Sequence, residues 1–303
     1  MSSLIKLSRI NKINNNLIEK YCHGKIEAIE FDGLGDVYST YAPRLLSYIK
    51  DPAYANTLND NKCIAGVICK KKDAELINER IIKVICDDPN YAFFSIVNDR
   101  ARDLFANHQT VTNNAIIPPN SYVADNGVIL GRNITIEPNV IINPGVEIGD
   151  GSIIRSGAVL GLDTFQHQRH MGGIISPKHD GVLVVGKCVE IGANTCISKG
   201  FSYSPTIIKD HTKIDALTYI AHGSKIGESV IICAGARIMG HVTIENNCFI
   251  GPSATVTSRI KVGQSAKISI GSVVTQDVPQ NERYTGNFAI PHKIWINFIK
   301  GIR

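Results

Sequence analysis

The stretch Ile208-Lys-Asp-His-Thr-Lys-Ile214-Asp-Ala-Leu-Thr-Tyr-Ile220-Ala-His-Gly-Ser-Lys-Ile226 places an isoleucine at every sixth position. The pattern continues to Val274, with isoleucine or valine at each sixth residue. Neither an α-helix nor an alternating strand produces this period. A fixed hexapeptide period is typical of a parallel β-helix, in which every turn contributes inward aliphatic side chains to one stacked core.

The same period occurs upstream, but its register is interrupted. It runs through residues 130–160, reappears shifted by one position at 185–197, and is restored at Ile208. Glycine and proline break the pattern within 161–184, so this segment is predicted to be a loop extruded from the coil. Three hexapeptides form one triangular coil, and residues about 18 apart should therefore lie one above the other.

The period is absent before residue 112, where Ala65–Cys69 and Ile81–Cys86 have the pattern of short buried strands. Asp73–Glu79 and Tyr91–Phe105 have a helical pattern. The sequence predicts a mainly β protein with three parts: a small α/β domain at 1–112, a β-helix at 113–285, and a tail with a short helix at 286–303.

Composition favours a cytoplasmic protein. The 303 residues are 44% hydrophobic and carry a net charge of +5, without basic runs interleaved with aromatic residues, which argues against a nucleic-acid partner. Charged and polar residues interrupt the first 17 positions, and no segment is apolar enough for a membrane span. The eight cysteines lack C-x-x-C spacing, so we expect reduced thiols and no metal site.

Two motifs, one in each domain, resemble a known family. Val189-Glu-Ile-Gly-Ala-Asn-Thr-Cys-Ile197 precedes Lys213-Ile-Asp215 and Ile220-Ala-His222, and the first domain contains Tyr48-Ile-Lys-Asp-Pro-Ala-Tyr54. They are similar to motifs of the UDP-3-O-acylglucosamine N-acyltransferases, whose N-terminal domain holds uracil through an aromatic-x-x-Asn-Pro-x-Tyr motif. The resemblance covers nearly the whole chain. It implies a left-handed β-helix and a homotrimer with its active sites in grooves between subunits.

The chain departs from the family pattern in three places. Asp51 replaces the motif's asparagine, and Arg259 stands where the family has a second histidine. The family's long C-terminal helical extension, which helps to receive acyl carrier protein, is missing, whereas Ile270–Pro279 and Gly286-Asn287 resemble the closing coil of acetyl-coenzyme A dependent sugar acetyltransferases. We therefore expect no bound cofactor and an acyl thioester co-substrate, with acyl-coenzyme A favoured over acyl carrier protein.

The expected chemistry centres on His222. Acyl transfer to an amine needs a group that takes the amine proton, and a histidine with a pKa near 6.5 suits that task. His222 should point out of the coil, and Gly240, one coil further, could offer a backbone N–H to the oxyanion of the thioester. The resemblance also assigns Asp215 to the site, to orient the imidazole or bind the amine.

The remaining candidates bind substrates. Tyr48 and Tyr54 would flank a pyrimidine, and Asp51 would accept its N3–H. Further candidates are His167, His170 and His241 for the nucleotide sugar, and Arg259 and Lys267 for phosphates of the donor. His167, His170 and His179 crowd the extruded loop, where they could ligate zinc or, as we favour, contact substrate phosphates or solvent.

The sequence thus predicts a homotrimeric nucleotide-sugar N-acyltransferase of lipid A or surface-polysaccharide synthesis. One alternative is a sugar O-acetyltransferase. Another is a metal-dependent lyase of the carbonic anhydrase type, which needs three converging histidines. A third is a scaffold without catalytic activity.

Overall fold

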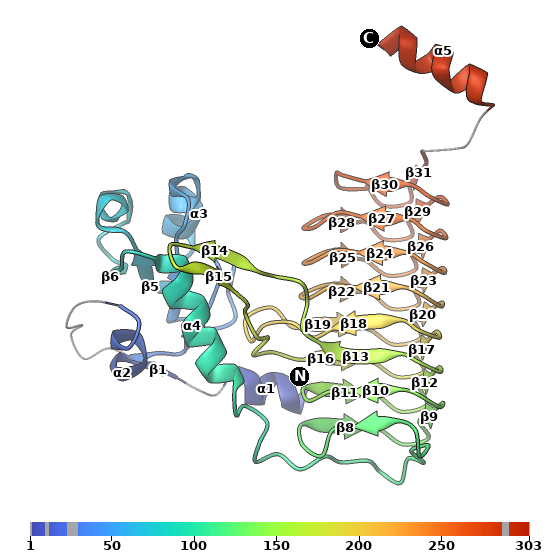
Figure 1. Cartoon of the computed structure of the whole chain (residues 1–303), viewed down its shortest axis with the longest axis horizontal. Helices are drawn as coiled ribbons and strands as arrows, with labels where there is room; N and C mark the ends of the chain where they lie inside the picture. Colours follow the sequence, from blue (N-terminus) through green and yellow to red (C-terminus); the bar gives the residue numbers. More distant parts are fainter. Residues whose placement is uncertain (1, 10–11, 23–29, 287–290, 303) are drawn as a thin grey trace.

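The computed structural model describes residues 2–9, 12–22, 30–286 and 291–302. It confirms the fold class: a left-handed parallel β-helix stands beside a smaller N-terminal domain (Figure 1). The β-helix has three faces, each a parallel sheet with one strand from every coil, and the described residues give these sheets eight, seven and eight strands.

The first sheet contains β7 (Tyr122–Val123), β10 (Ile141–Ile142), β13 (Val159–Leu162), β18 (Cys196–Ser198), β21 (Tyr219–Ile220), β24 (Arg237–Ile238), β27 (Thr255–Val256) and β30 (Val273–Val274). The second contains β8 (Val128–Leu130), β11 (Val146–Ile148), β16 (Leu183–Val185), β19 (Thr206–Ile208), β22 (Lys225–Ile226), β25 (Thr243–Ile244) and β28 (Lys261–Val262). The third contains β9 (Thr135–Ile136), β12 (Ile153–Ile154), β17 (Glu190–Ile191), β20 (Lys213–Ile214), β23 (Ile231–Ile232), β26 (Phe249–Ile250), β29 (Lys267–Ile268) and β31 (Arg283–Tyr284).

The core of the β-helix consists of the aliphatic residues that define the period. In the two-residue strands the second side chain points inward, as the pair Ile231 and Ile232 shows: the first is 47% exposed and the second is fully buried. Tyr219 pairs with Arg237, one coil of 18 residues further on, as the period predicts. Each coil therefore adds a layer to one continuous core.

Two insertions, rather than one, interrupt the coils. Val159 pairs with Cys196, 37 positions further on instead of 18, because the chain leaves the coil at the predicted loop 161–184. Leu183 pairs with Thr206, 23 positions further on, so five more residues leave the coil within 199–205. The extra 19 and 5 residues together make 24, a multiple of six, which explains why the register is restored at Ile208.

The N-terminal domain contains a parallel four-stranded sheet of β3 (Gly33–Leu34), β4 (Leu45–Tyr48), β5 (Ile64–Cys69) and β6 (Ile82–Ile85), in that order. Its other elements are α1 (Ser3–Arg9), β1 (Ile13–Asn14), α2 (Asn15–Glu19), β2 (Glu30–Phe31), η1 (Pro52–Tyr54), α3 (Ala55–Asp60), η2 (Lys71–Leu76) and α4 (Pro89–Ala101). The expected strands are present, and the expected helix at 73–79 is the 3₁₀ helix η2.

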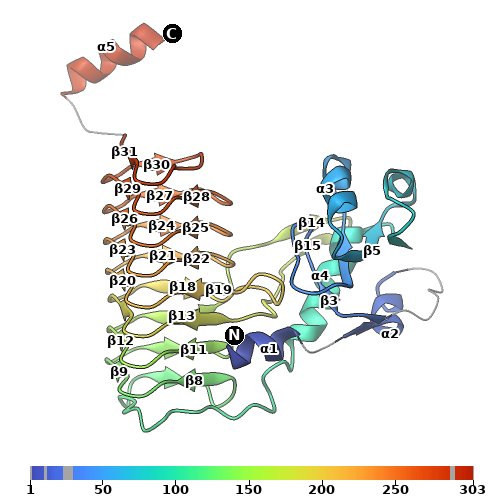
Figure 2. The same ribbon diagram turned by 180° about the vertical axis from the view of Figure 1, so that it is seen from behind.

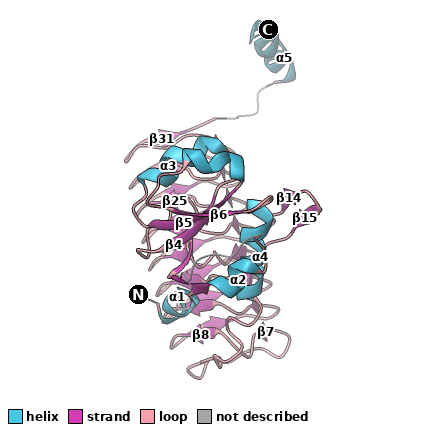
Figure 3. Ribbon diagram, turned by 90° about the vertical axis from the view of Figure 1, so that its left-hand side faces the viewer, coloured by secondary structure: helices cyan, strands magenta, loops and turns pink. Residues whose placement is uncertain are grey.

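Both insertions hold the two domains together. The first forms the hairpin β14 (Gln168–His170) and β15 (Gly173–Ile175), which crosses to α4 (Figure 2). There the His170 ring stacks on Tyr91, with 4.6 Å between ring centroids. Phe201, from the second insertion, shares a buried cluster with Phe93 and Phe94 of α4. Figure 3 shows the N-terminal domain covering one side of the β-helix.

The chain ends in α5 (His292–Ile302), which projects beyond β31 (Figure 1). It matches the short helix expected from residue 293 and exposes Ile294, Trp295 and Phe298. Asn287 of the resemblance motif and Arg303 lie outside the described residues. None of the described helices combines the length and the apolar character needed to cross a bilayer.

The core predicts a contrast between two neighbouring isoleucines. Ile232→Ala should lower the free energy of unfolding by about 2–5 kcal/mol, because it leaves a cavity between stacked coils. Ile231→Ala removes an outward side chain and should change it by about 0.5 kcal/mol or less. Urea denaturation of both variants measures the difference. Equal destabilisation would contradict the inward and outward assignment.

Candidate functional site

Three histidine rings meet where the β-helix faces the N-terminal domain; we name His179, His222 and His241 the histidine cluster. His222 follows β21, His241 follows β24, and His179 comes from the extruded loop. The His222 ring centroid lies 5.4 Å from that of His179 and 4.9 Å from that of His241. The coil period places His222 and His241 on adjacent coils, whereas the path of the loop brings in His179.

Glycines make room for both histidines of the coil. A Cβ atom at Gly240, one coil beyond His222, would lie 2.8 Å from Cε1 of the His222 ring. A Cβ atom at Gly223 would lie 2.6 Å from Nδ1 of His241 and 2.7 Å from Oγ of Ser204. These last two atoms form a hydrogen bond of 3.1 Å. Larger residues at either glycine would therefore displace a histidine ring.

Burial keeps the cluster neutral. Desolvation, followed by the charges of His241, His179 and Arg259, lowers the pKa of His222 to about 3. Desolvation and then the charge of Arg259 lower the pKa of His241 to about 4. Burial also lowers the pKa of His179. At neutral pH these imidazoles therefore have a lone pair available, as a proton acceptor requires.

The structure places Gly240 beside His222 but puts Asp215 on a different face of the coil. The backbone N–H of Gly240 donates no hydrogen bond within the described residues, and Gly240 itself is buried. Asp215 follows β20 in the third sheet, seven residues before His222, and its Oδ1 accepts a hydrogen bond from the N–H of Ala216 (2.7 Å). Within this chain Asp215 does not contact the His222 ring.

The second insertion supplies residues that sequence reasoning missed. Phe201 packs on two rings of the cluster, with centroid distances of 4.3 Å to His179 and 5.8 Å to His222. Tyr203 stacks on Phe201 at 5.3 Å, and Ser204 orients His241. The spacing of 11 residues between Ile197 and Ile208 was the signal that could have revealed this insertion.

A pocket of about 580 Å³ brings Tyr48, Asp51 and Tyr54 together with Arg259 of the β-helix. One face of the Tyr48 ring is covered by Phe93, at 4.4 Å between centroids. Oδ1 of Asp51 accepts a hydrogen bond from the N–H of Ala53 (2.9 Å) and so caps η1. The predicted pyrimidine residues thus converge, and Arg259 closes their pocket from the opposite domain.

A second pocket, of about 540 Å³, continues from the first to His241; the other two histidines of the cluster, His179 and His222, do not line it. Both pockets are lined by Asp36, Tyr38 and Arg259. Arg259 lies over the Tyr38 ring (5.1 Å to its centroid) and 3.8 Å from a carboxylate oxygen of Asp36. The second pocket is also lined by His241. Arg259 therefore stands between the tyrosine pocket and the histidines.

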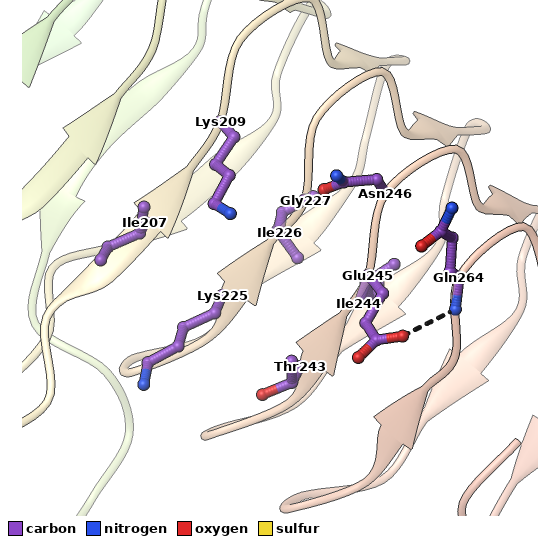
Figure 4. A pocket seen from close by; sticks show the side chains of 10 residues that line it. All are labelled: Ile207, Lys209, Lys225, Ile226, Gly227, Thr243, Ile244, Glu245, Asn246 and Gln264. Atoms are coloured by element: carbon purple, nitrogen blue, oxygen red, sulfur yellow. Dashed lines mark hydrogen bonds between the residues drawn. The ribbon is translucent and has the colours of Figure 1, made fainter. Parts of the chain in front are cut away.

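A third pocket, of about 390 Å³, extends the second along the outer face of the β-helix (Figure 4). The two share Ile207, Lys225 and Thr243. Figure 4 shows the side chains of Lys209 and Lys225 on this face. One continuous surface thus runs from the tyrosines past His241 to two lysines.

Three predicted substrate contacts lie elsewhere. His167 is at the base of the hairpin, where its Nδ1 is 2.8 Å from Oγ of Ser176, and His170 stacks on α4. Lys267 lies in β29 of the third sheet and lines none of these three pockets. Although three histidines converge, the described residues include no set of three histidine, cysteine or carboxylate side chains arranged to hold a metal ion.

The repeats of the β-helix match known transferase repeats. Residues 127–161, 205–240 and 223–258 match the family described as bacterial transferase hexapeptide (six repeats). Residues 241–276 match the hexapeptide repeat of succinyl-transferase.

Curated relatives carry the name suggested by the sequence motifs. The UDP-3-O-acylglucosamine N-acyltransferase of Methylorubrum extorquens (strain PA1) is 36% identical over 138 residues, which cover 46% of this chain and 39% of the relative. The probable UDP-3-O-acylglucosamine N-acyltransferase 2, mitochondrial, of Arabidopsis thaliana is 36% identical over 111 residues, 37% of this chain and 36% of that protein. The chain thus matches less than half the length of these relatives.

Among solved structures, UDP-N-acetylglucosamine acyltransferase from Campylobacter jejuni aligns with a TM-score of 0.53 and 26% identity, covering 59% of this chain and 67% of that chain. The chain therefore carries the hexapeptide repeats of bacterial transferases, and its resemblance to the UDP-3-O-acylglucosamine N-acyltransferases is confirmed over the segments that these matches cover.

Proposed function

We propose that this protein transfers an acyl group from a thioester to the amine of a nucleotide-linked amino sugar. The main support is the continuous surface that joins the tyrosine pocket, Arg259 and His241, whose ring lies 4.9 Å from that of His222. A pyrimidine between Tyr48 and Tyr54 would extend its phosphates toward Arg259 and its sugar toward His241. The names of the relatives support the same reaction class.

The transfer needs one proton acceptor and one oxyanion donor. The amine nitrogen attacks the thioester carbonyl, a C–N bond forms, and neutral His222 takes the proton from that nitrogen. The N–H of Gly240 stabilises the oxyanion, a contribution of about 3 kcal/mol in comparable sites. The C–S bond then breaks, and His222 returns the proton to the leaving thiolate.

The third pocket is suited to the donor. Lys209 and Lys225 present two positive charges on the side of His241 opposite the tyrosines, where they can meet a phosphate of acyl-coenzyme A. Acyl carrier protein, whose prosthetic group carries a phosphate, is the alternative donor. Lys267 stands apart from this surface, so the lysine pair is the better candidate for donor contacts.

The resemblance supports a cytoplasmic homotrimer acting in lipid A or surface-polysaccharide synthesis. In such a trimer the outer face of one β-helix faces that of its neighbour. Asp215, which does not reach His222 within the chain, would then serve the site of a neighbouring subunit.

Loss of the proton acceptor should abolish most turnover. We expect His222→Ala to lower kcat by about 100-fold or more, because the base is removed while the binding pockets remain. Mass spectrometry of the acylated sugar measures turnover with acyl-coenzyme A and acyl carrier protein donors at equal concentration. Sedimentation of both proteins as trimers is the control for folding. Wild-type turnover in the variant, or a fully active monomer, would contradict the mechanism or the assembly.

Arg259 should affect acceptor binding more than chemistry. Losing one charge-assisted contact costs about 1.5–3 kcal/mol, so Arg259→Ala should raise KM for the nucleotide sugar by about 10-fold or more and change kcat by a smaller factor. Arg237→Ala, on the outer face of β24, is the matched control. If Arg259→Ala instead raised KM for the acyl donor, Arg259 would be assigned to donor binding, as the sequence predicted.

The buried histidines predict a stability loss in acid. An unfolded histidine has a pKa near 6.5, whereas burial lowers the pKa of His222 to about 3 and that of His241 to about 4. Between pH 7 and about pH 4 the unfolded chain takes up protons that these folded residues do not, so the unfolding free energy falls. His222→Gln should reduce that fall.

Urea denaturation at pH 7 and pH 4.5 measures this effect. His108→Gln, which changes an exposed histidine, should keep the wild-type dependence on pH. If His222→Gln also keeps the wild-type dependence of the unfolding free energy on pH, burial does not lower the pKa of His222 and the prediction is wrong.

A further inference from the structure

We propose that His179 is a positioning residue for His222: its Nε2 accepts the Nδ1–H of His222, and this leaves Nε2 of His222 as the atom that takes the proton. The inference rests on the proposed function for its catalytic meaning, but the orientation itself can be tested without activity.

A backbone carbonyl fixes the tautomer of His179. Its Nδ1 lies 2.9 Å from the carbonyl oxygen of Lys199, and His179 is only 2% exposed. A carbonyl oxygen only accepts hydrogen bonds, so Nδ1 of His179 carries the hydrogen. Burial lowers the pKa of His179, which keeps the ring neutral. Its Nε2 therefore holds a lone pair.

Two nitrogens of the neighbouring rings complement each other. Nε2 of His179 and Nδ1 of His222 are both buried, and neither has a hydrogen-bond partner among the described residues. A buried polar atom without a partner costs about 1–3 kcal/mol. The ring centroids are 5.4 Å apart with planes inclined by 60°, so a small rotation of either ring can bring the two nitrogens within direct hydrogen-bond distance.

This pairing works in only one tautomer of His222. The lone pair of His179 needs a donor, so Nδ1 of His222 must carry its hydrogen. Nε2 of His222 then keeps the lone pair that a general base requires. His179 thus supplies what a carboxylate supplies to the base in a Ser-His-Asp triad, namely the correct tautomer and orientation.

Contacts from both domains hold His179 in place. Its backbone N–H donates to Oδ1 of Asp163 (3.2 Å). The next residue, Asp180, is fully buried, lies 3.5 Å from Nε of Arg100, and accepts a hydrogen bond from Oγ of Ser202 (2.8 Å). The extruded loop, α4 and the second insertion therefore fix the ring that orients the base.

The first experiment reads the tautomer directly. In the protein labelled with [¹⁵N]histidine, the His222 signals are assigned by their loss in His222→Gln. We expect wild-type His222 to carry its hydrogen on Nδ1, and His179→Phe to give a mixture of tautomers. A hydrogen on Nε2 of wild-type His222 overturns the proposal, even if no acyl transfer is detected. Unchanged signals in His179→Phe overturn it as well.

The second experiment measures kinetics. His179→Phe should lower kcat by about 10- to 100-fold and change either KM by about 2-fold or less, because orientation rather than binding is lost. His179→Gln keeps a donor for Lys199 and an acceptor for His222, so it should restore most of kcat. His108→Phe controls for the loss of an unrelated histidine. Equal losses in the Phe and Gln variants, or a loss confined to KM, would show that His179 does not position His222.

Discussion

The stacking of coils at an interval of 18 residues is the constraint on which this structure depends. Each coil buries its aliphatic residues against the next, and backbone hydrogen bonds join neighbouring coils, as between His241 N–H and the His222 carbonyl oxygen (2.9 Å). A side chain at one corner therefore lies directly above the residue 18 positions before it. Gly240 lies over His222, and Arg259 lies over His241, for this reason alone.

The two insertions that interrupt the stacking supply much of the candidate site. Residues inserted between strands need not follow the core, so they can reach the neighbouring domain and the outer edge of the coil. The first insertion brings His179 to the cluster and the hairpin to α4. The second packs Phe201 against the His179 ring and brings Ser204 within hydrogen-bond distance of His241. The regular coils thus hold His222 and His241 in fixed positions, and the two insertions add the residues that surround them.

The period therefore predicted the fold and part of the site. The repeat in the sequence shows directly which residues point inward and how many residues form one coil. Because each coil stacks on the one before it, the repeat also places Gly240 beside His222. His179 could not be placed, because its position depends on how the extruded loop packs on α4. The second insertion was not predicted, because the two insertions together add a multiple of six residues and so restore the hexapeptide register. Nor does any period reveal that Arg259 lines the same pocket as Tyr48, since that depends on docking of the two domains.

The low basicity of the cluster is compatible with proton transfer. An imidazole with a pKa near 3 is a weak base toward a free amine, but the nitrogen becomes acidic once it has bonded to the carbonyl carbon. Moreover, Arg259 is one of the charges that lower the pKa of both His222 and His241. An anion bound at Arg259 offsets that charge, and the imidazoles become more basic when the acceptor's phosphates are in place. Under the proposed function, the group that holds the acceptor thus also adjusts the base.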